Sequence, residues 1–182
     1  MLLTIIIAVG VLVVALLAFA ARRPDTFVVQ RSVAIKASPE TVYPLISDWH
    51  NFLVWSPFEK GPSMKRAFKG AASGKGAIYE WDGNNKVGAG RIEIMEAIAP
   101  SSLVMQLDMI RPMKAQNTVE FTVAAKGGTT DVTWTMKGRV PFLGKLMGLV
   151  MNCDKMVGSQ FEEGLAKLKG VAEKPSQRVA AA

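Results

Sequence analysis

The hydrophobic and polar positions of this chain separate first at its amino terminus. Residues 1–21 carry no charged side chain, and the run ends at Arg22-Arg23-Pro24. About 20 apolar residues, in a helix that rises about 1.5 Å per residue, span roughly 30 Å, which is the hydrocarbon thickness of a bilayer. The pattern therefore predicts one transmembrane helix over residues 1–21.

Two other interpretations of this segment stay open. Ala18-Phe19-Ala20 has the small-x-small form of a signal-peptide cleavage site, although the segment lacks a basic start and its apolar run is long for a signal peptide. The third interpretation is a helix buried in the domain core, which would be apolar on every face.

Basic residues that flank a transmembrane helix tend to stay on the cytoplasmic side, so Arg22 and Arg23 predict a single-pass membrane protein with a cytoplasmic domain.

After the anchor, the periodicity changes to that of a strand followed by short helices. Residues 27–36 alternate between apolar and polar positions, although Arg31 interrupts the apolar face. Ser38 followed by Pro39 is typical of a helix N-terminus. A second short helix or turn is expected over residues 48–54.

Period-two alternation then continues to about residue 139, broken by turn residues at regular spacing. This spacing predicts a meandering antiparallel sheet. The expected strands are Met64–Lys69, Ala77–Trp81, Lys86–Ala97, Leu103–Met109, Ala115–Val123 and Asp131–Lys137.

The last predicted element is one long amphipathic helix over residues 142–171. A single helix must bury its apolar stripe against one face of the sheet, so the chain predicts an α+β fold with a cavity between the sheet and this helix. Residues 142–151 are apolar almost all round, with Lys145 the only charge, which indicates contact with lipid or a partner. The stripe consists of Leu143, Met147, Val150, Val157, Phe161, Leu165 and Leu168.

Four segments of the chain carry a resemblance to a known family. They are VVQRSVAIKASPETVYPLISDWHNFLVWSPFE (28–59), GKGAIYEWDGN (74–84), VTWTMKG (132–138) and FLGKLMGLVMNCDKMVGSQFEEGLAKLK (142–169). The chain resembles the SRPBCC superfamily of START-like proteins and, within it, the polyketide cyclase/dehydrase and lipid-transport group. The resemblance implies a helix-grip domain over residues 27–171, in which a curved antiparallel sheet wraps around a long C-terminal helix. This fold hosts lipid carriers, hormone receptors and cyclases, so it does not by itself name a function.

Composition narrows the expected partners. The net charge of +7, on a domain tethered to a membrane, favours anionic lipid headgroups. The charges are spread without a block of five like residues, so no nucleic-acid partner is expected. Cys153 is the only cysteine, which excludes an intramolecular disulfide and fits a reducing compartment. Residues 173–182 are polar and then Ala-rich, and a disordered tail is expected there.

No catalytic or cofactor motif is recognisable. His50 and Cys153 are the only histidine and cysteine, too few for an ordinary metal site, and there is no P-loop, dinucleotide fingerprint or nucleophile elbow. No catalytic residue, metal or cofactor is therefore assigned. His50 has two interpretations: a general acid or base, or a helix-end histidine bonded to Asp48 or to the backbone.

Candidate ligand-binding residues are those expected at the walls or mouth of the sheet–helix cavity. Aromatic rings suit a flat or acyl ligand, and flexible methionines suit an adaptable apolar wall. The set is Trp49, His50, Trp55, Trp81, Met105, Met136, Val150, Asp154 and Val157.

Asp154 falls close to the apolar stripe of the last helix and has two interpretations. A carboxylate there either lines the pocket or is buried, and a buried carboxylate needs a partner such as Arg31 or Arg91. Alternatively, the helix is rotated and Asp154 is solvated near Lys155.

Together these patterns predict a membrane-anchored protein that binds a hydrophobic small molecule or lipid. One alternative is a cyclase- or hydrolase-like enzyme that uses His50 and a pocket carboxylate. A second is an accessory subunit of a membrane complex whose cavity is filled. The oligomeric state is not predicted.

Overall fold

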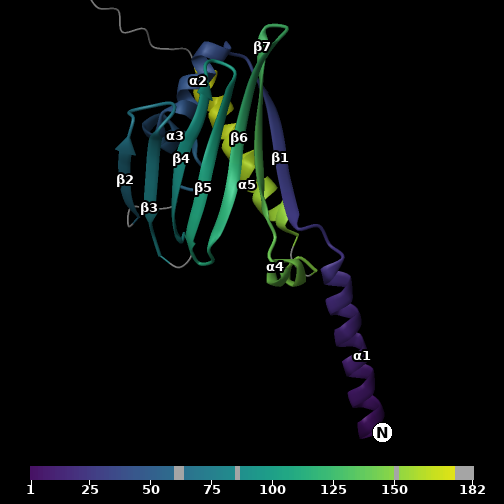
Figure 1. Ribbon diagram of the computed structural model, residues 1–182. Helices are drawn as coiled ribbons and strands as arrows, with labels where there is room; N and C mark the ends of the chain where they lie inside the picture. The colour runs from purple at the N-terminus through teal and green to yellow at the C-terminus, as the bar shows by residue number, and fades with distance from the viewer. Residues whose placement is uncertain (60–63, 85–86, 150–151, 175–182) are drawn as a thin grey trace, which may run out of the picture.

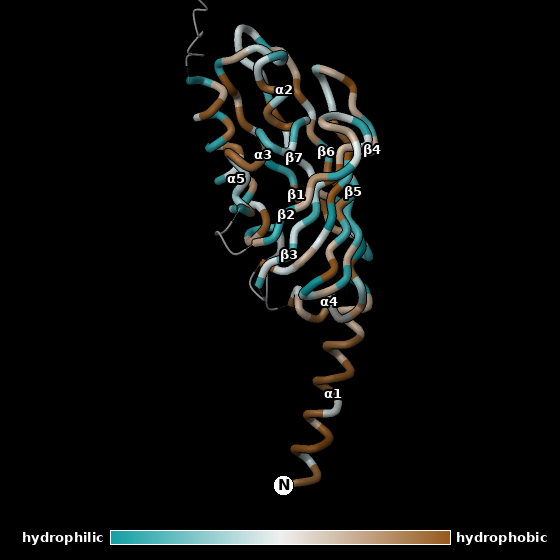
Figure 2. The backbone as a smooth tube through the Cα atoms, turned by 90° about the vertical axis from the view of Figure 1, so that its left-hand side faces the viewer, coloured by the Kyte–Doolittle hydropathy of each residue, from teal (hydrophilic) through white to brown (hydrophobic). Residues whose placement is uncertain are grey.

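The computed structural model describes residues 1–59, 64–84, 87–149 and 152–174. Its first element is an apolar helix that projects from a domain made of one sheet and several helices (Figure 1). Helix α1 (Leu2–Ala21) buries only Ala20 and is hydrophobic along its whole length (Figure 2). Among the described residues it is the one helix long and apolar enough to cross a bilayer. A helix of this kind exposed on every side is not a core helix, so the interpretation of a buried N-terminal helix is wrong.

Seven antiparallel strands form one curved sheet in the order β1-β7-β6-β5-β4-β3-β2. Strands β2 to β7 follow one another as the predicted meander, and β1 pairs with the last strand, with Val29 opposite Met136. The α+β helix-grip fold is thus confirmed. The strands are β1 (Thr26–Ile35), β2 (Lys65–Gly70), β3 (Ala77–Asp82), β4 (Ala89–Ile98), β5 (Ser102–Arg111), β6 (Ala115–Lys126) and β7 (Thr129–Arg139).

Strand β4 begins at Ala89, later than predicted, and a turn at Val87 precedes it. Gly88 has a positive φ of 75°, and a Cβ there would lie 2.3 Å from the carbonyl oxygen of Arg111. The amide of Gly83 donates to the Gly88 carbonyl oxygen, which closes the β3–β4 turn. Lys86, the predicted start of the strand, lies outside the described residues.

Two short helices carry the chain from one edge of the sheet to the other. Helix α2 (Pro39–Ser47) begins at the predicted Ser38-Pro39 signal, and α3 (Trp49–Trp55) follows directly. The Asp48 carboxylate accepts a hydrogen bond from the His50 amide and caps α3.

The predicted single helix over residues 142–171 is wrong, because the structure has two helices there. Helix α4 (Phe142–Met147) ends at Gly148, and α5 (Cys153–Ala172) starts anew after Asn152. Asn152 has an extended backbone, and its side-chain oxygen accepts from the amide of Lys155. This N-cap starts a second helix within a hydrophobic stripe that looks continuous in the sequence.

Helix α5 packs on the same face of the sheet as α2 and α3. An aromatic stacking contact joins the side of α5 that faces the sheet to strand β7. The Trp134 and Phe161 rings lie 4.1 Å apart and nearly parallel, at 6°. A Cβ at Gly164 would approach Trp134 to 2.9 Å, so glycine allows the helix to lie close to the sheet. This contact fills the middle of the grip and leaves space nearer the N-terminal end of α5.

Candidate ligand-binding cavity

A cavity of about 340 Å³ lies between the sheet, the first turns of α5 and the segment that joins α3 to β2. Its walls come from alternate positions of the strands, because successive side chains point to opposite faces of a sheet. On β5, Met105, Leu107 and Met109 all face inward in this way. Met136 of β7 and Val157 of α5 face them across the space. The volume and apolar lining are those of a small-molecule site.

One polar cluster interrupts the apolar wall. The Glu59 side chain is only 13% exposed, and its Oε1 accepts a hydrogen bond of 2.6 Å from the Tyr79 hydroxyl. Its Oε2 accepts a bond of 2.8 Å from Nε of Arg66, whose Nη2 is 2.7 Å away. The carboxylate is therefore held by a cation and a phenol, as a buried charge requires.

Burial, and then the hydrogen bond to Glu59, raises the pKa of Tyr79 above its ordinary value. The phenol is therefore protonated throughout the physiological range and acts as a hydrogen-bond donor. Asn117 of β6 and Gln160 of α5 add further polar atoms to the lining. The cavity thus combines apolar walls with a small number of fixed hydrogen-bonding groups.

The sequence did not single out Glu59, Arg66 or Tyr79. The period-two pattern that put Trp81 on the inner face of β3 also puts Tyr79 there, and this signal was available. No local signal brings Glu59 and Arg66 together, because their contact depends on the path of the chain between α3 and β2.

Four predicted ligand-binding residues line the cavity: Trp81, Met105, Met136 and Val157. Two of the other predicted residues, Trp55 and Trp49, are buried elsewhere in the domain. Trp55 is fully buried, and its indole nitrogen donates to the Leu45 carbonyl oxygen at 2.8 Å. Trp49 is buried against Phe52 at the base of α3. Val150 lies outside the described residues.

His50, a predicted ligand-binding residue, does not lie in the lining of this cavity. Its side chain is 67% exposed, and Nδ1 is 3.2 Å from Oδ1 of Asp48. The ring stacks on Phe68 at 4.4 Å, on the outer side of α3. It is the helix-end histidine of the second interpretation, because α3 turns its first residue, Trp49, inward instead.

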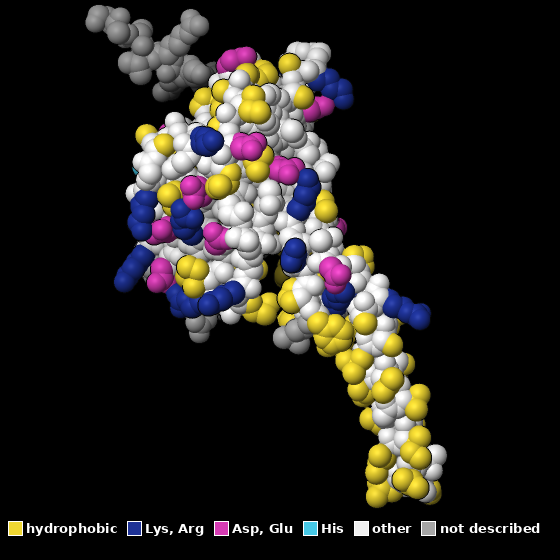
Figure 3. Space-filling model, in the orientation of Figure 1, with side chains coloured by type: hydrophobic (Ala, Val, Ile, Leu, Met, Phe, Trp, Pro, Cys, Tyr) yellow, Lys and Arg dark blue, Asp and Glu magenta, His cyan; other side chains and the backbone are white. Residues whose placement is uncertain are grey.

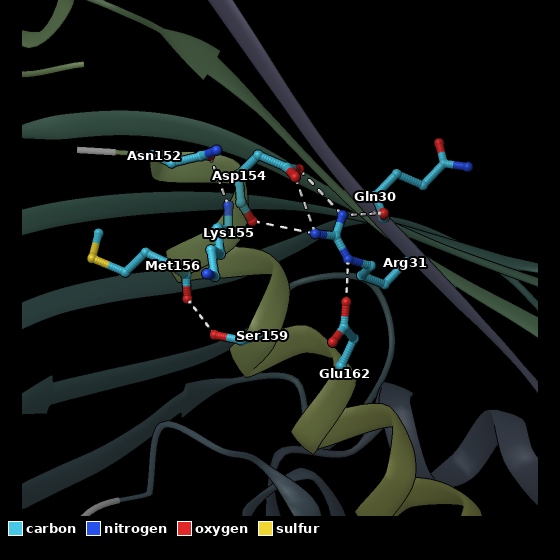
Figure 4. Close-up of polar contacts among 8 residues, drawn as sticks. All are labelled: Gln30, Arg31, Asn152, Asp154, Lys155, Met156, Ser159 and Glu162. Atoms are coloured by element: carbon cyan, nitrogen blue, oxygen red, sulfur yellow. Dashed lines mark hydrogen bonds and ion pairs between the residues drawn. The ribbon is translucent and has the colours of Figure 1, made fainter. Parts of the chain in front are cut away.

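Asp154 does not line the cavity either, and Figure 4 shows its carboxylate directed toward Arg31. Its side chain is 58% exposed, so the interpretation of a buried or pocket-lining carboxylate is wrong. Arg31 of β1 is nevertheless its partner, with Nη2 3.1 Å from Oδ2 and Nη1 3.2 Å from Oδ1. The same guanidinium donates through Nε to Glu162 at 2.6 Å. Arg91, the other proposed partner, pairs instead with Glu93 at 2.5 Å.

Arg31 thus ties the first three turns of α5 to the edge strand β1. Its hydrogen bonds lower the pKa of Asp154 below the ordinary value. The clamp positions α5, and with it Val157, over the cavity, so Arg31 and Asp154 shape the site without lining it. Among the described residues, no three His, Cys, Asp or Glu side chains are grouped to hold a metal ion.

A curved antiparallel sheet that grips a C-terminal helix, with an apolar cavity between them, defines the class of helix-grip ligand-binding folds. The family model described as polyketide cyclase / dehydrase and lipid transport matches residues 26–173. The chain belongs to this family. No protein with a curated description matches the sequence at a significant level.

Solved structures share the fold at low sequence identity. The Aha1 dimer from Colwellia psychrerythraea is 16% identical with a TM-score of 0.58, over 81% of this chain and 97% of that one. The major latex-like protein 151 from Panax ginseng is 12% identical with a TM-score of 0.60, over 82% and 99%. The di-domain ARO/CYC protein BexL of the BE-7585A biosynthetic pathway is 14% identical with a TM-score of 0.61, over 86% and 53%.

Proposed function

We propose that this protein is a membrane-anchored binding protein for a hydrophobic small molecule or lipid, held in the cavity between the sheet and α5. The observation that carries the proposal is the unfilled apolar space of about 340 Å³. An accessory subunit without a ligand would gain stability by filling such a space with side chains. The open cavity therefore favours ligand binding over the accessory-subunit alternative.

The anchor is supported by the length and surface of α1. The helix has 20 residues and a mean hydropathy of 3.1 in its most apolar window. Lipid would cover the side chains that water would otherwise meet. Arg22 and Arg23, on the C-terminal side of α1, support a cytoplasmic position of the domain. Amino-terminal sequencing of the mature protein tests whether α1 is retained as an anchor. A mature chain that starts near Ala21 would be the product of a cleaved signal peptide.

The experiment for the ligand is native mass spectrometry of the full chain, purified from its own host in lipid nanodiscs. A retained apolar molecule, displaced by fatty acids of similar size, supports the proposal. A chain that retains nothing, and that takes up no fatty acid added in excess, contradicts it.

A second candidate is a cyclase-like activity, which the Glu59–Tyr79 pair in the cavity wall favours. A proton donor and a carboxylate within 2.6 Å of each other are suited to general acid–base catalysis. In the same spectrometer, a bound molecule that loses water over time in the wild type, but not in Glu59→Gln, would identify an enzyme. A molecule that leaves unchanged would identify a carrier.

A further inference from the structure

The end of the domain from which α1 leaves also carries the β5–β6 turn, α4 and the start of α5 (Figures 1 and 2). Only Arg22 to Asp25 separate the end of α1 from the start of β1. Four residues reach at most about 14 Å when fully extended. If α1 spans a bilayer, as proposed above, this end of the domain must lie close to the lipid headgroups.

Contacts of the linker between α1 and β1 with α4 and its C-cap fix this arrangement further. Nη1 of Arg23 donates to the carbonyl oxygen of Gly148 at 2.8 Å. The buried Lys145 ammonium lies 2.5 Å from the Asp25 carboxylate. Helix α4 is therefore held beside the point where the chain would enter the membrane.

Large hydrophobic side chains are exposed at this end, on three segments that are distant in sequence. Soluble surfaces rarely gather several such side chains unless they contact a partner or a membrane. We name this set the membrane-facing rim: Ile110 and Met113 around the β5–β6 turn, Phe142 and Met147 of α4, and Met156 of α5.

The charges at this end are mainly positive. The carboxylates of Asp82 and Asp154 pair with Arg111 and Arg31, as Asp25 does with Lys145. Among the described residues, Arg22, Lys114 and Lys155 have no ion-pair partner. Figure 3 shows basic side chains along this edge of the domain, next to hydrophobic ones that continue toward α1. Exposed apolar groups among basic ones match an anionic lipid surface.

Part of the cavity lining reaches the same end of the domain. Its fully buried lining residues, such as Met105 and Phe121, lie deep between the sheet and α5. Several of its partly exposed lining residues, among them Met109, Met136 and Val157, lie where β5 and β7 finish and α5 begins, and Phe58, which is 40% exposed, lies on the segment that joins α3 to β2.

We infer that the membrane-facing rim inserts into the headgroup layer of the bilayer that α1 spans, so that the cavity mouth opens onto lipid. A ligand then passes between bilayer and cavity without crossing bulk water. This inference rests on the proposed anchor and ligand, and it adds a second membrane contact that neither of them requires.

The test uses the full chain in vesicles of phosphatidylcholine and phosphatidylserine, with a polarity-sensitive fluorophore on Met113→Cys in a Cys153→Ser background. The matched control carries the fluorophore on Lys126→Cys, at the β6–β7 turn of the opposite end. Lipids with a quencher near the headgroup should quench the probe at position 113 and not the probe at position 126. Equal, low quenching at both positions overturns the inference. It is also overturned if the probe at position 113 becomes shielded as the protein concentration rises and not when lipid is added, because a second protein molecule would then cover that position.

A second variant pair tests the consequence for transfer. Ile110→Glu should slow the exchange of a fluorescent fatty acid between vesicles and protein by roughly fivefold or more, because it places a like charge against anionic lipid. Ile98→Glu is the control, since Ile98 is similarly exposed (60% against 54%) and lies at the opposite end of the β4–β5 hairpin. Equal exchange rates in the two variants contradict the inference. Two further measurements separate this inference from the proposals on which it rests. Sedimentation of the chain with vesicles tests the anchor, and equilibrium uptake of the fatty acid tests the cavity. If both succeed while the exchange rates of the two variants are equal, only the inference about the rim is contradicted.

Discussion

The guanidinium of Arg31 lies directly against Gly158, at the level of the second turn of α5. A Cβ on Gly158 would be 2.0 Å from Nη2 and 2.4 Å from Cζ of that arginine. Because Arg31 is also held by Asp154 and Glu162, it has no free direction in which to move. Glycine at this position therefore permits the clamp that fixes α5 to β1.

The Gly158→Ala variant should lower the melting temperature of the full chain, although alanine is the better helix former by about 1 kcal/mol. Gly170 on the same helix is the control, because a Cβ there meets nothing within 4 Å, and Gly170→Ala should raise the melting temperature. In an Arg31→Ala background, the penalty of Gly158→Ala should disappear. Equal stabilisation by both alanines in the wild-type background would show that Gly158 is not needed for the clamp.

The Arg31–Asp154 pair should make a pH-dependent contribution to stability. The folded-state pKa of Asp154 is lowered by Arg31, so the contribution is fully present above the unfolded value near 4 and is lost as the pH falls through the folded pKa. The difference in melting temperature between wild type and Asp154→Asn should be constant from about pH 7 to 5 and shrink below about pH 4. The effect is modest, because Asp154 is exposed. A difference that grows on acidification would contradict this assignment.

The only two tyrosines of the chain should both titrate late. Burial raises the pKa of Tyr43, and burial with the Glu59 hydrogen bond raises that of Tyr79. Near-ultraviolet absorbance should therefore show less tyrosinate at about pH 10 in the folded chain than in the chain unfolded in guanidinium, which titrates around that pH. Stability that depends on the neutral phenols is present below about pH 10 and falls as the pH rises beyond it. In the Tyr43→Phe variant, Tyr79 is the only tyrosine that contributes to the absorbance. If Tyr79 is half ionised near pH 10 in this folded variant, its burial beside Glu59 is contradicted.

Tyr79→Phe should destabilise the folded chain by about 1–2 kcal/mol, because the buried Glu59 carboxylate loses a hydrogen bond of 2.6 Å. Tyr43→Phe is the comparison, since its hydroxyl makes a longer bond of 3.3 Å to the Ser102 carbonyl oxygen. Denaturant unfolding of both variants measures the difference. A smaller loss for Tyr79→Phe than for Tyr43→Phe would mean that Glu59 does not depend on this donor.

Much of the fold could be predicted because its signals are local. Period two located all seven strands, the Ser38-Pro39 pair located α2, and an apolar run located α1. The break between α4 and α5 was missed because the hydrophobic stripe runs past it. Only the capping geometry of Asn152 reveals that a new helix begins there.

The cavity was predicted less completely, because its composition depends on rotation and long-range contact. Inward strand positions such as Met105 and Met136 followed from alternation. The spacing of Asp154 from the apolar stripe suggests a place near the cavity, but the first turn of α5 directs its side chain to Arg31 on the edge strand β1. The chemistry of a histidine makes His50 a candidate, but it carries no information about which side of α3 the side chain occupies.

The most direct test of the account is the affinity of the full chain, in nanodiscs, for a fluorescent fatty acid when the cavity is narrowed. Leu107→Trp adds bulk to the cavity wall, and Gln106→Trp adds the same bulk to the outer face of the same strand. The account predicts that Leu107→Trp weakens binding by about tenfold or more, equivalent to ~1.4 kcal/mol, while Gln106→Trp binds as the wild type does. Equal affinities in the two variants, or no saturable binding to the wild type, would contradict the claim that this cavity holds the ligand.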